Sequence, residues 1–230
     1  MQRTRVPELM DDPALDAAEH RHALAGLARL NRVSQSARLP WDSVRRVALG
    51  TRGRTLRVLD VACGSADAAI AAARSARRHG IDACWTACDI SECALREAAD
   101  AARCAGVELR TVRVDLLREP LPAEQDLVTC SLFLHHLDRP DAVRALAAMH
   151  ASARSGAVID LDRTRLGLAL AWMASRMLSR SRIVRFDAPA SVRAAWRPDE
   201  ALRMARDAGI ADARVRRAWP ERWVLTWGLA

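Results

Sequence analysis

The sequence predicts an α/β protein in which a mostly parallel sheet carries helices on both faces. Three observations lead to this prediction. From residue 55 onward, short apolar segments typical of strands alternate with segments of helical periodicity. Three of the predicted helices end at a glycine, a residue that favours the end of a helix. The chain has 230 residues, 50% of them hydrophobic, which suffices for one domain with a complete core.

The first 50 residues are predicted to be helical. Apolar positions recur at helical spacing over 13–39, and a shorter helix over 41–49 follows Pro40. We expect the helix 13–39 to act as a lid over a ligand site. Residues 1–50 are therefore interpreted as an N-terminal helical cap, and residues 51–230 as the main domain.

Strands and helices alternate in the main domain. The predicted strands are 55–61, 83–89, 108–115, 126–134 and 157–161, and the predicted helices between them are 66–80, 91–106 and 139–156. Ser91 fits the N-cap of a helix, and Gly80, Gly106 and Gly156 would end the three helices. This order predicts parallel strands, because each helix carries the chain back to the same edge of the sheet.

The C-terminal third adds two helices and a hairpin. Helices are predicted at 166–179 and 198–209, followed by strands at 213–219 and 222–228 with Pro220 between them. The two strands would form an antiparallel hairpin that completes a doubly wound, seven-stranded sheet. We expect residues 165–197 to be an insertion that covers a substrate pocket.

The composition limits the possible locations and partners. The net charge is +8 and all 36 basic residues are arginine, which we interpret as solvated arginine on helix faces rather than as a nucleic-acid surface. The N-terminus lacks the apolar core of a signal peptide, and the longest apolar run, 166–174, is too short to cross a bilayer. We therefore expect a cytoplasmic protein with reduced cysteines.

The six cysteines do not have the spacing of a metal site. No pair is spaced C-x-x-C, and the spacing of Cys84, Cys88 and Cys93 fits no iron–sulfur pattern. We interpret the cysteines as small buried hydrophobic residues, and we expect no bound metal.

Acidic residues follow three consecutive predicted strands. Asp60, Asp89 and Asp115 stand at or near the ends of the first three strands, and Asp160 ends the fifth. Ligands of open parallel sheets bind beyond the carboxyl ends of the strands. Because carboxylates gathered at one edge repel one another, they indicate a ligand rich in hydroxyl and amine donors.

The loop after the first strand indicates the charge of that ligand. It reads "ACGSAD" over 62–67 and lacks the G-x-G-x-x-G pattern that a pyrophosphate needs. Asp67, at the start of the next helix, would repel a phosphate. A ligand with an ammonium or sulfonium group fits better, which favours S-adenosylmethionine over NAD.

Residues 55 to about 165 resemble the class I S-adenosylmethionine-dependent methyltransferases, especially those of ubiquinone and menaquinone biosynthesis. The motifs that carry the resemblance are "VLDVACGSAD" (58–67), "CDIS" (88–91), "VRVDLL" (112–117) and "DLVTCSLFLHHL" (126–137). The segments "SLFLHHLDRPDAV" (131–143) and 160–196 are similar to bacterial methyltransferases encoded near type III polyketide synthases. The resemblance implies a Rossmann-like sheet with an antiparallel C-terminal strand.

The resemblance also implies a cofactor site. Asp89 would bind the ribose hydroxyls, Asp115 the adenine amino group, and Gly64 would let the backbone approach the methionine part. The full set of implied cofactor-binding residues is Asp60, Ala62, Cys63, Gly64, Asp67, Asp89, Ile90, Asp115, Leu116, Ser131 and Leu132. Family members usually have glycine at positions 62 and 66, where alanine is costly if φ is positive.

The predicted reaction is methyl transfer to a small aromatic or lipidic acceptor, with a phenolic hydroxyl of a polyketide or phenolic lipid as the first choice. His135 and His136 are candidates for the base or substrate anchor. Asp160, Met173 and Met177 are candidate substrate contacts. The apolar stripe and basic end of the segment 165–187 fit transient contact with a membrane surface.

Three alternatives remain open at the level of the sequence. They are C-methylation of a quinone-type ring, a non-catalytic binding protein on the same fold, and nucleic-acid methylation. The last lacks both the Asn/Asp-Pro-Pro-aromatic loop and a Pro-Cys nucleophile, so we expect no nucleic-acid partner. Metal-dependent catechol methylation lacks its Asp-Asn ligands, because Asn31 is the only asparagine. The sequence does not define the oligomeric state.

Overall fold

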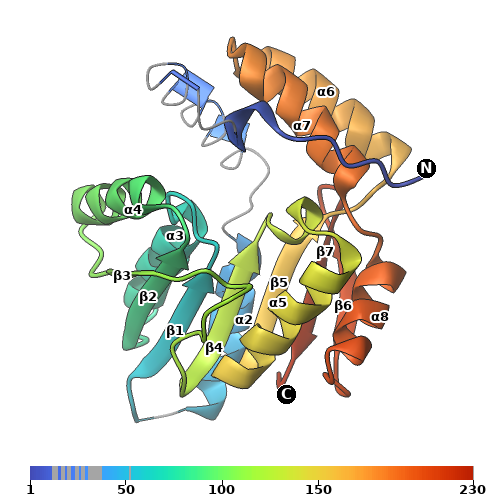
Figure 1. Cartoon of the computed structure of the whole chain (residues 1–230). Coiled ribbons are helices and arrows are strands. Elements are labelled where there is room, and N and C mark those ends of the chain that lie inside the picture. The colour runs from blue at the N-terminus through green and yellow to red at the C-terminus, as the bar shows by residue number, and fades with distance from the viewer. Residues whose placement is uncertain are drawn as a thin grey trace.

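The computed structural model contains one seven-stranded sheet with helices on both faces (Figure 1). The structure describes residues 1–11, 15, 16, 19, 22, 23, 26, 29, 30, 38–51 and 53–229. The strands are β1 (Leu56–Val61), β2 (Ala83–Asp89), β3 (Arg110–Arg113), β4 (Gln125–Ser131), β5 (Ala153–Leu161), β6 (Arg214–Ala218) and β7 (Arg222–Trp227), in the order β3-β2-β1-β4-β5-β7-β6. Among these strands, β7 alone runs in the opposite direction to the other six, so its pairs with β5 and β6 are antiparallel and the other pairs are parallel. The predicted fold class is confirmed.

The helices divide between the two faces of the sheet and one end of it. They are α2 (Arg38–Gly50), α3 (Asp67–Arg78), α4 (Glu92–Cys104), α5 (Arg139–Ser152), α6 (Arg165–Leu178), α7 (Arg182–Ala194) and α8 (Pro198–Asp207), with short 3-10 helices η1 (Leu9–Asp11) and η2 (Leu134–His136). α2, α3 and α4 share a core on one face, and α5 and α8 share the core on the other. α6 and α7 pack against each other beyond the carboxyl ends of β4 and β5 (Figure 1). No helix in the described part of the chain is long and apolar enough to cross a membrane.

The packing of β1 explains why the central strands have almost entirely apolar sequences. Leu56 and Val58 pack into the core under α3, whereas Leu59 and Val61 pack into the core under α5. Successive side chains of a strand point to opposite faces, so a strand covered on both faces needs apolar residues throughout. Asp60 is a polar exception in this strand and is 3% exposed.

The boundary between α5 and β5 differs from the prediction. The helix predicted over 139–156 ends at Ser152, and Gly156 lies inside β5 opposite Trp227 of β7. A Cβ at Gly156 would lie 1.9 Å from the Trp227 ring, so this position is glycine because the indole lies over its backbone. Gly156 is therefore required by the close packing of β5 against Trp227 of β7, and it does not end a helix.

Other boundaries shift by a few residues, and one helix was missed. β4 ends at Ser131, and the predicted extension to 134 enters η2. β3 is four residues long, against eight predicted. α7 was not predicted as a helix, and it contains Pro189, a residue that argues against helix in a sequence pattern. The predicted helix 13–39 falls mostly outside the described residues.

Candidate active site

The strand register brings the predicted site residues to one edge of the sheet. Val61 lies opposite both Cys88 of β2 and Cys130 of β4, and Ser131 lies opposite Ile159 of β5. The last residues of four adjacent parallel strands therefore meet at one edge, where ligands of such sheets bind.

The loop after β1 contains three residues with positive φ. Gly64 has φ +53°, and Ala62 and Ala66 have φ +51° and +56°. Nothing lies within 4 Å of a Cβ built on Gly64, so this glycine meets the backbone requirement and leaves open space above it. The two alanines adopt the left-handed conformation at a cost of about 1–2 kcal/mol each, and backbone strain of this kind gathers at functional sites.

Two other predicted residues belong to this loop. Cys63 is partly buried, and burial raises the pKa of its thiol well above the usual value, so the thiol stays protonated. Asp67 is the first residue of α3 and is exposed at the helix N-terminus. An exposed carboxylate at this position is compatible with a cationic ligand and opposes a phosphate.

Asp89 holds the glycine loop against β2. Its carboxylate accepts the backbone N–H of Gly64 at 2.9 Å and that of Ser91 at 2.9 Å. Ser91 in turn caps α4, because its hydroxyl accepts the N–H of Ala94. The residue predicted to bind ribose hydroxyls therefore also fixes the loop that faces the ligand, and a carboxylate retains lone pairs for a diol.

Asp60 is buried beneath the loop and lies opposite Thr129 of β4. The Thr129 hydroxyl donates a hydrogen bond of 2.7 Å to its carboxyl group. Burial raises the pKa of Asp60 to about 7, the hydrogen bond from Thr129 opposes this shift, and the charge of Asp89 adds to it. A cation bound nearby would favour the ionised form.

The residues after β2 and β3 form an apolar and acidic corner. Asp115 accepts the N–H of Leu117 at 3.0 Å, which orders the turn that presents its carboxyl group. Leu116 is buried, whereas Ile90 is 56% exposed. An exposed isoleucine next to a carboxylate suits an adenine ring, which has apolar faces and an amine edge.

Ser131 and Leu132 end β4 with two unusual features. The Ser131 hydroxyl oxygen is buried and has no hydrogen-bond partner among the described residues. Leu132 has φ +57°, and its N–H donates to the Ile159 carbonyl at 2.8 Å. A buried hydroxyl without a partner is costly, so it marks a place where a ligand would complete the hydrogen bonding.

His135 and Asp160 form a buried pair beside this strand end. Asp160 is fully buried and accepts the backbone N–H of His135 at 2.9 Å and hydrogen-bonds its Nδ1 at 2.7 Å. These two hydrogen bonds fix the orientation of His135, and the burial of Asp160 leaves no face of its carboxylate for a substrate hydroxyl. Asp160 also acts on Arg222: burial lowers the pKa of Arg222 to about 10, and the negative charge of Asp160 opposes this lowering.

The remaining predicted residues differ in accessibility. His136 is partly buried, with its ring centroid 4.2 Å from that of His135 and 6.2 Å from that of Phe133. Met173 and Met177 lie on the outer surface of α6, with 48% and 76% of their area exposed. The structure therefore brings the histidines to the strand ends and leaves the two methionines facing solvent.

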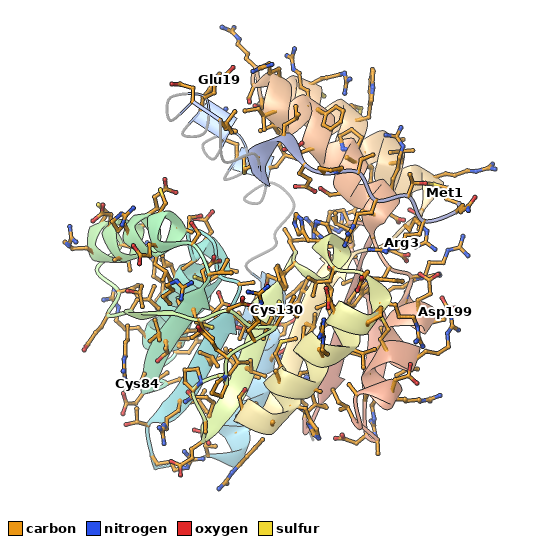
Figure 2. The ribbon with its side chains drawn as sticks, in the orientation of Figure 1. Met1, Arg3, Glu19, Cys84, Cys130 and Asp199 are labelled. Carbon is orange, nitrogen blue, oxygen red and sulfur yellow. The ribbon has the colours of Figure 1, made fainter. Side chains whose placement is uncertain are left out.

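Sequence reasoning missed the N-terminal segment, which closes over η2. The Arg3 guanidinium donates to the carbonyls of His135, Leu137 and Ala194 at 2.6–3.0 Å, and it lies between the α6–α7 pair and the end of the sheet (Figure 2). Glu8 on this segment reaches His135, with 3.8 Å between its Oε1 and the histidine Nε2. No local pattern indicates this contact, because the partners are more than 120 residues apart.

Glycine at the two strained alanines should stabilise the protein. Ala62→Gly and Ala66→Gly remove the left-handed penalty, offset by the greater freedom of glycine in the unfolded chain. Ala62→Gly should raise the free energy of unfolding by about 0.5–1 kcal/mol, and Ala66→Gly should raise it by less, because Ala66 is 0% exposed and its methyl group is lost from the core. Ala71→Gly in the middle of α3 is the control and should lower it by about 1 kcal/mol. Urea unfolding measures the free energy of all three variants. Equal destabilisation by the three would contradict the claim that the positive φ of Ala62 and Ala66 strains the loop.

The buried Asp60 should make stability depend on pH. Its pKa near 7 exceeds the unfolded value of about 3.9, so the folded state retains a proton that the unfolded state has lost. The contribution of Asp60 to the free energy of unfolding is fully present below about pH 4 and is lost as the pH rises to about 7. Relative to Asp60→Asn, the wild type should lose on the order of 2–4 kcal/mol across this range. A difference between the two proteins that does not change with pH would refute the shifted pKa.

Comparison with known proteins agrees with this geometry. Residues 58–156, a little under half of the chain, match a family model described as a methyltransferase domain. The match covers the loop, Asp89, Asp115, Ser131 and the histidine pair. No curated protein sequence matches the chain.

Solved structures share the fold at low identity. PigF with SAH matches at 17% identity with a TM-score of 0.56, over 74% of this chain and 50% of that chain. Apo SibL, an S-adenosylmethionine-dependent methyltransferase, matches at 21% identity with a TM-score of 0.65, over 97% of this chain and 62% of that chain. The plantazolicin methyltransferase BpumL with SAH matches at 12% identity with a TM-score of 0.67, over 94% of this chain and 90% of that chain. The chain thus spans only 50% and 62% of PigF and SibL. These likenesses establish the fold, and residues 58–156 are similar to a methyltransferase domain.

Proposed function

We propose that the protein transfers a methyl group from S-adenosylmethionine to a small-molecule acceptor, with a phenolic hydroxyl of an aromatic polyketide or phenolic lipid as the favoured substrate. The observation that carries the proposal is the convergence of Asp60, Asp89 and the Ser131 hydroxyl around a strained glycine loop. That hydroxyl is buried and has no hydrogen-bond partner in the part of the chain that the structure describes. This convergence lies within the residues that match the methyltransferase domain.

The residues at the strand ends fit the parts of S-adenosylmethionine. In this proposal Asp89 accepts the ribose hydroxyls, Asp115 accepts the adenine amino group, and Ile90 and Leu116 cover the ring. The open space above Gly64 would take the methionine part, and the buried Asp60 would support the loop from beneath. SAH in the structures of PigF and BpumL supports this choice of cofactor. When bound, the sulfonium supplies an already activated methyl group.

The protein's main tasks are then alignment and removal of the acceptor proton. Alignment of nucleophile and carbon supplies much of the rate enhancement of such displacements. Because both Asp160 oxygens hold His135, this imidazole is fixed in orientation. His136, which is partly buried beside it, is the histidine with access to an acceptor hydroxyl. BpumL in complex with a monoazolic desmethylPZN analog supports a natural-product acceptor.

The proposal predicts methyl transfer that depends on His136. With methyl-labelled S-adenosylmethionine and a panel of phenols, with and without long alkyl chains, label should move to the phenol oxygen. His136→Ala should lower turnover by about 10²–10⁴-fold while calorimetry finds cofactor affinity nearly unchanged. His150→Ala, on an exposed histidine of α5, is the control and should retain activity.

Each other outcome of this assay has a defined meaning. Equal loss of cofactor binding in His136→Ala would remove the catalytic role of His136. Label on a ring carbon of a quinone-type acceptor would favour C-methylation. Cofactor binding without transfer to any acceptor would favour a non-catalytic binding protein.

We propose that α6 and α7 cover the acceptor side and touch a lipid surface. Five large apolar side chains are more than 45% exposed on these helices, namely Leu166, Trp172, Met173, Met177 and Phe186. Arg176, Arg180, Arg182 and Arg185 lie on or between the same helices. This combination fits a long-chain acceptor reached at an anionic membrane surface.

Vesicle flotation tests the lipid contact. The protein should float with vesicles that contain anionic lipid, and binding should weaken several-fold in Trp172→Ser/Met177→Ser, which remove exposed apolar area. Leu49→Ser, an exposed residue of α2, is the matched control. Absence of the wild type from the floating fraction would reject the membrane contact.

A further inference from the structure

We propose that Glu8, His135 and His136 bind a divalent transition-metal ion of the zinc type. One carboxylate oxygen and one nitrogen from each histidine all lie within 4.8 Å of one another. The Glu8 Oε1 and His135 Nε2 are 3.8 Å apart. Ligand atoms about 2.0–2.2 Å from one central ion are at most about 4.4 Å apart, and about 3.4 Å apart in a tetrahedron. Side-chain rotations that bring the three ligand atoms together by roughly 1 Å would therefore complete the site.

The ligands are held as metal ligands commonly are. Asp160 lies 2.7 Å from the Nδ1 of His135, and a proton between them leaves the Nε2 lone pair directed at Glu8. Glu8 is itself held, because the Ser191 hydroxyl donates to its Oε1. A carboxylate on the far nitrogen of a metal-bound histidine fixes its tautomer and raises its basicity.

His135 is buried and the other two ligands are partly buried, and a fixed segment of the chain carries Glu8. The side chains of His135 and Glu8 are 4% and 14% exposed. Before Glu8, the Arg5 guanidinium donates to the His136 carbonyl at 2.8 Å. After it, the N–H groups of Leu9 and Met10 donate to the Asp187 carboxylate. Contacts on both sides of Glu8 therefore place its carboxylate against the histidines, and a buried carboxylate needs a partner of opposite charge.

The ligand types select the ion. Two imidazole nitrogens and one carboxylate are a common set for Zn²⁺ and for other transition metals of similar softness, whereas Mg²⁺ prefers oxygen ligands. Three protein ligands leave at least one position open. If the proposed function holds, this position would take the acceptor oxygen, because a bound cation lowers the pKa of a coordinated hydroxyl. His136 would then promote loss of the acceptor proton as a ligand of the ion and not as the base itself.

The sequence predicted no metal site because it has neither a C-x-x-C pair nor an Asp-Asn pair. A ligand set that joins residue 8 to residues 135 and 136 has no local spacing. Only the fold of the N-terminal segment onto η2 brings the three side chains together.

Zinc titration of the chelator-treated full chain tests the inference. Calorimetry should find one Zn²⁺ per chain and no binding of Mg²⁺. Asp160→Asn should weaken zinc binding by about 10–100-fold, and Glu8→Gln, which retains an oxygen for Ser191, should weaken it at least as much. His150→Ala should bind like the wild type.

Equal zinc affinity in the wild type and Glu8→Gln, or no binding by the wild type, would overturn the site. The alternative is then a His135 ring held between the Asp160 and Glu8 carboxylates with no ion. If the variants do not fold, Co²⁺ added to the wild type decides: visible bands of a four- or five-coordinate ion support the site, and the spectrum of the free aqueous ion rejects it. Zinc binding without methyl transfer would support the site and count against the proposed function only.

Discussion

The hydrogen bonds that Asp89 accepts from the Gly64 and Ser91 amides are the contacts on which the site depends. They connect the loop after β1 to the start of α4 and fix both at the end of β2. The loop can then hold Ala62 and Ala66 in a conformation that alanine otherwise avoids. Without these hydrogen bonds, the loop would still be joined to β2 by the bond of 3.1 Å from the Cys63 N–H to the Cys88 carbonyl, but Gly64 would lose its anchor on Asp89.

A second set of contacts organises the acceptor side. Asp160, at the end of β5, holds His135 through both its backbone and its ring. The N-terminal segment closes over the same turn, with Arg3 bonded to three carbonyls and stacked 3.6 Å from the centroid of the Trp196 ring. Burial lowers the pKa of Arg3 to about 10, which leaves the guanidinium charged near neutral pH. In the proposed function, the ends of β1–β3 and of β4 hold the cofactor, and the His135–Asp160 pair beside β5 lies on the acceptor side.

Most of the sheet was predictable because its causes are local. A strand covered on both faces is apolar throughout, and the acids at the ends of β1, β2 and near β3 interrupt that pattern at the functional edge. Three errors had non-local causes. Gly156 is required by Trp227 from another strand, α7 tolerates Pro189 inside a packed helix, and Glu8 reaches His135 across the whole domain. Each of these three features depends on contacts between residues far apart in the chain, and a short segment of sequence gives no sign of such contacts.

The central claim is that the edge around Asp89 binds S-adenosylmethionine, and calorimetric titration of the cofactor tests it most directly. A charged hydrogen bond to a diol contributes about 1.5–3 kcal/mol, so Asp89→Asn should weaken binding by about 10–100-fold. Asp100→Asn, on an exposed aspartate of α4, should bind like the wild type. Binding by the wild type with this loss at Asp89 would support the account. Absence of binding by the folded wild type, or equal affinity in Asp89→Asn, would contradict it.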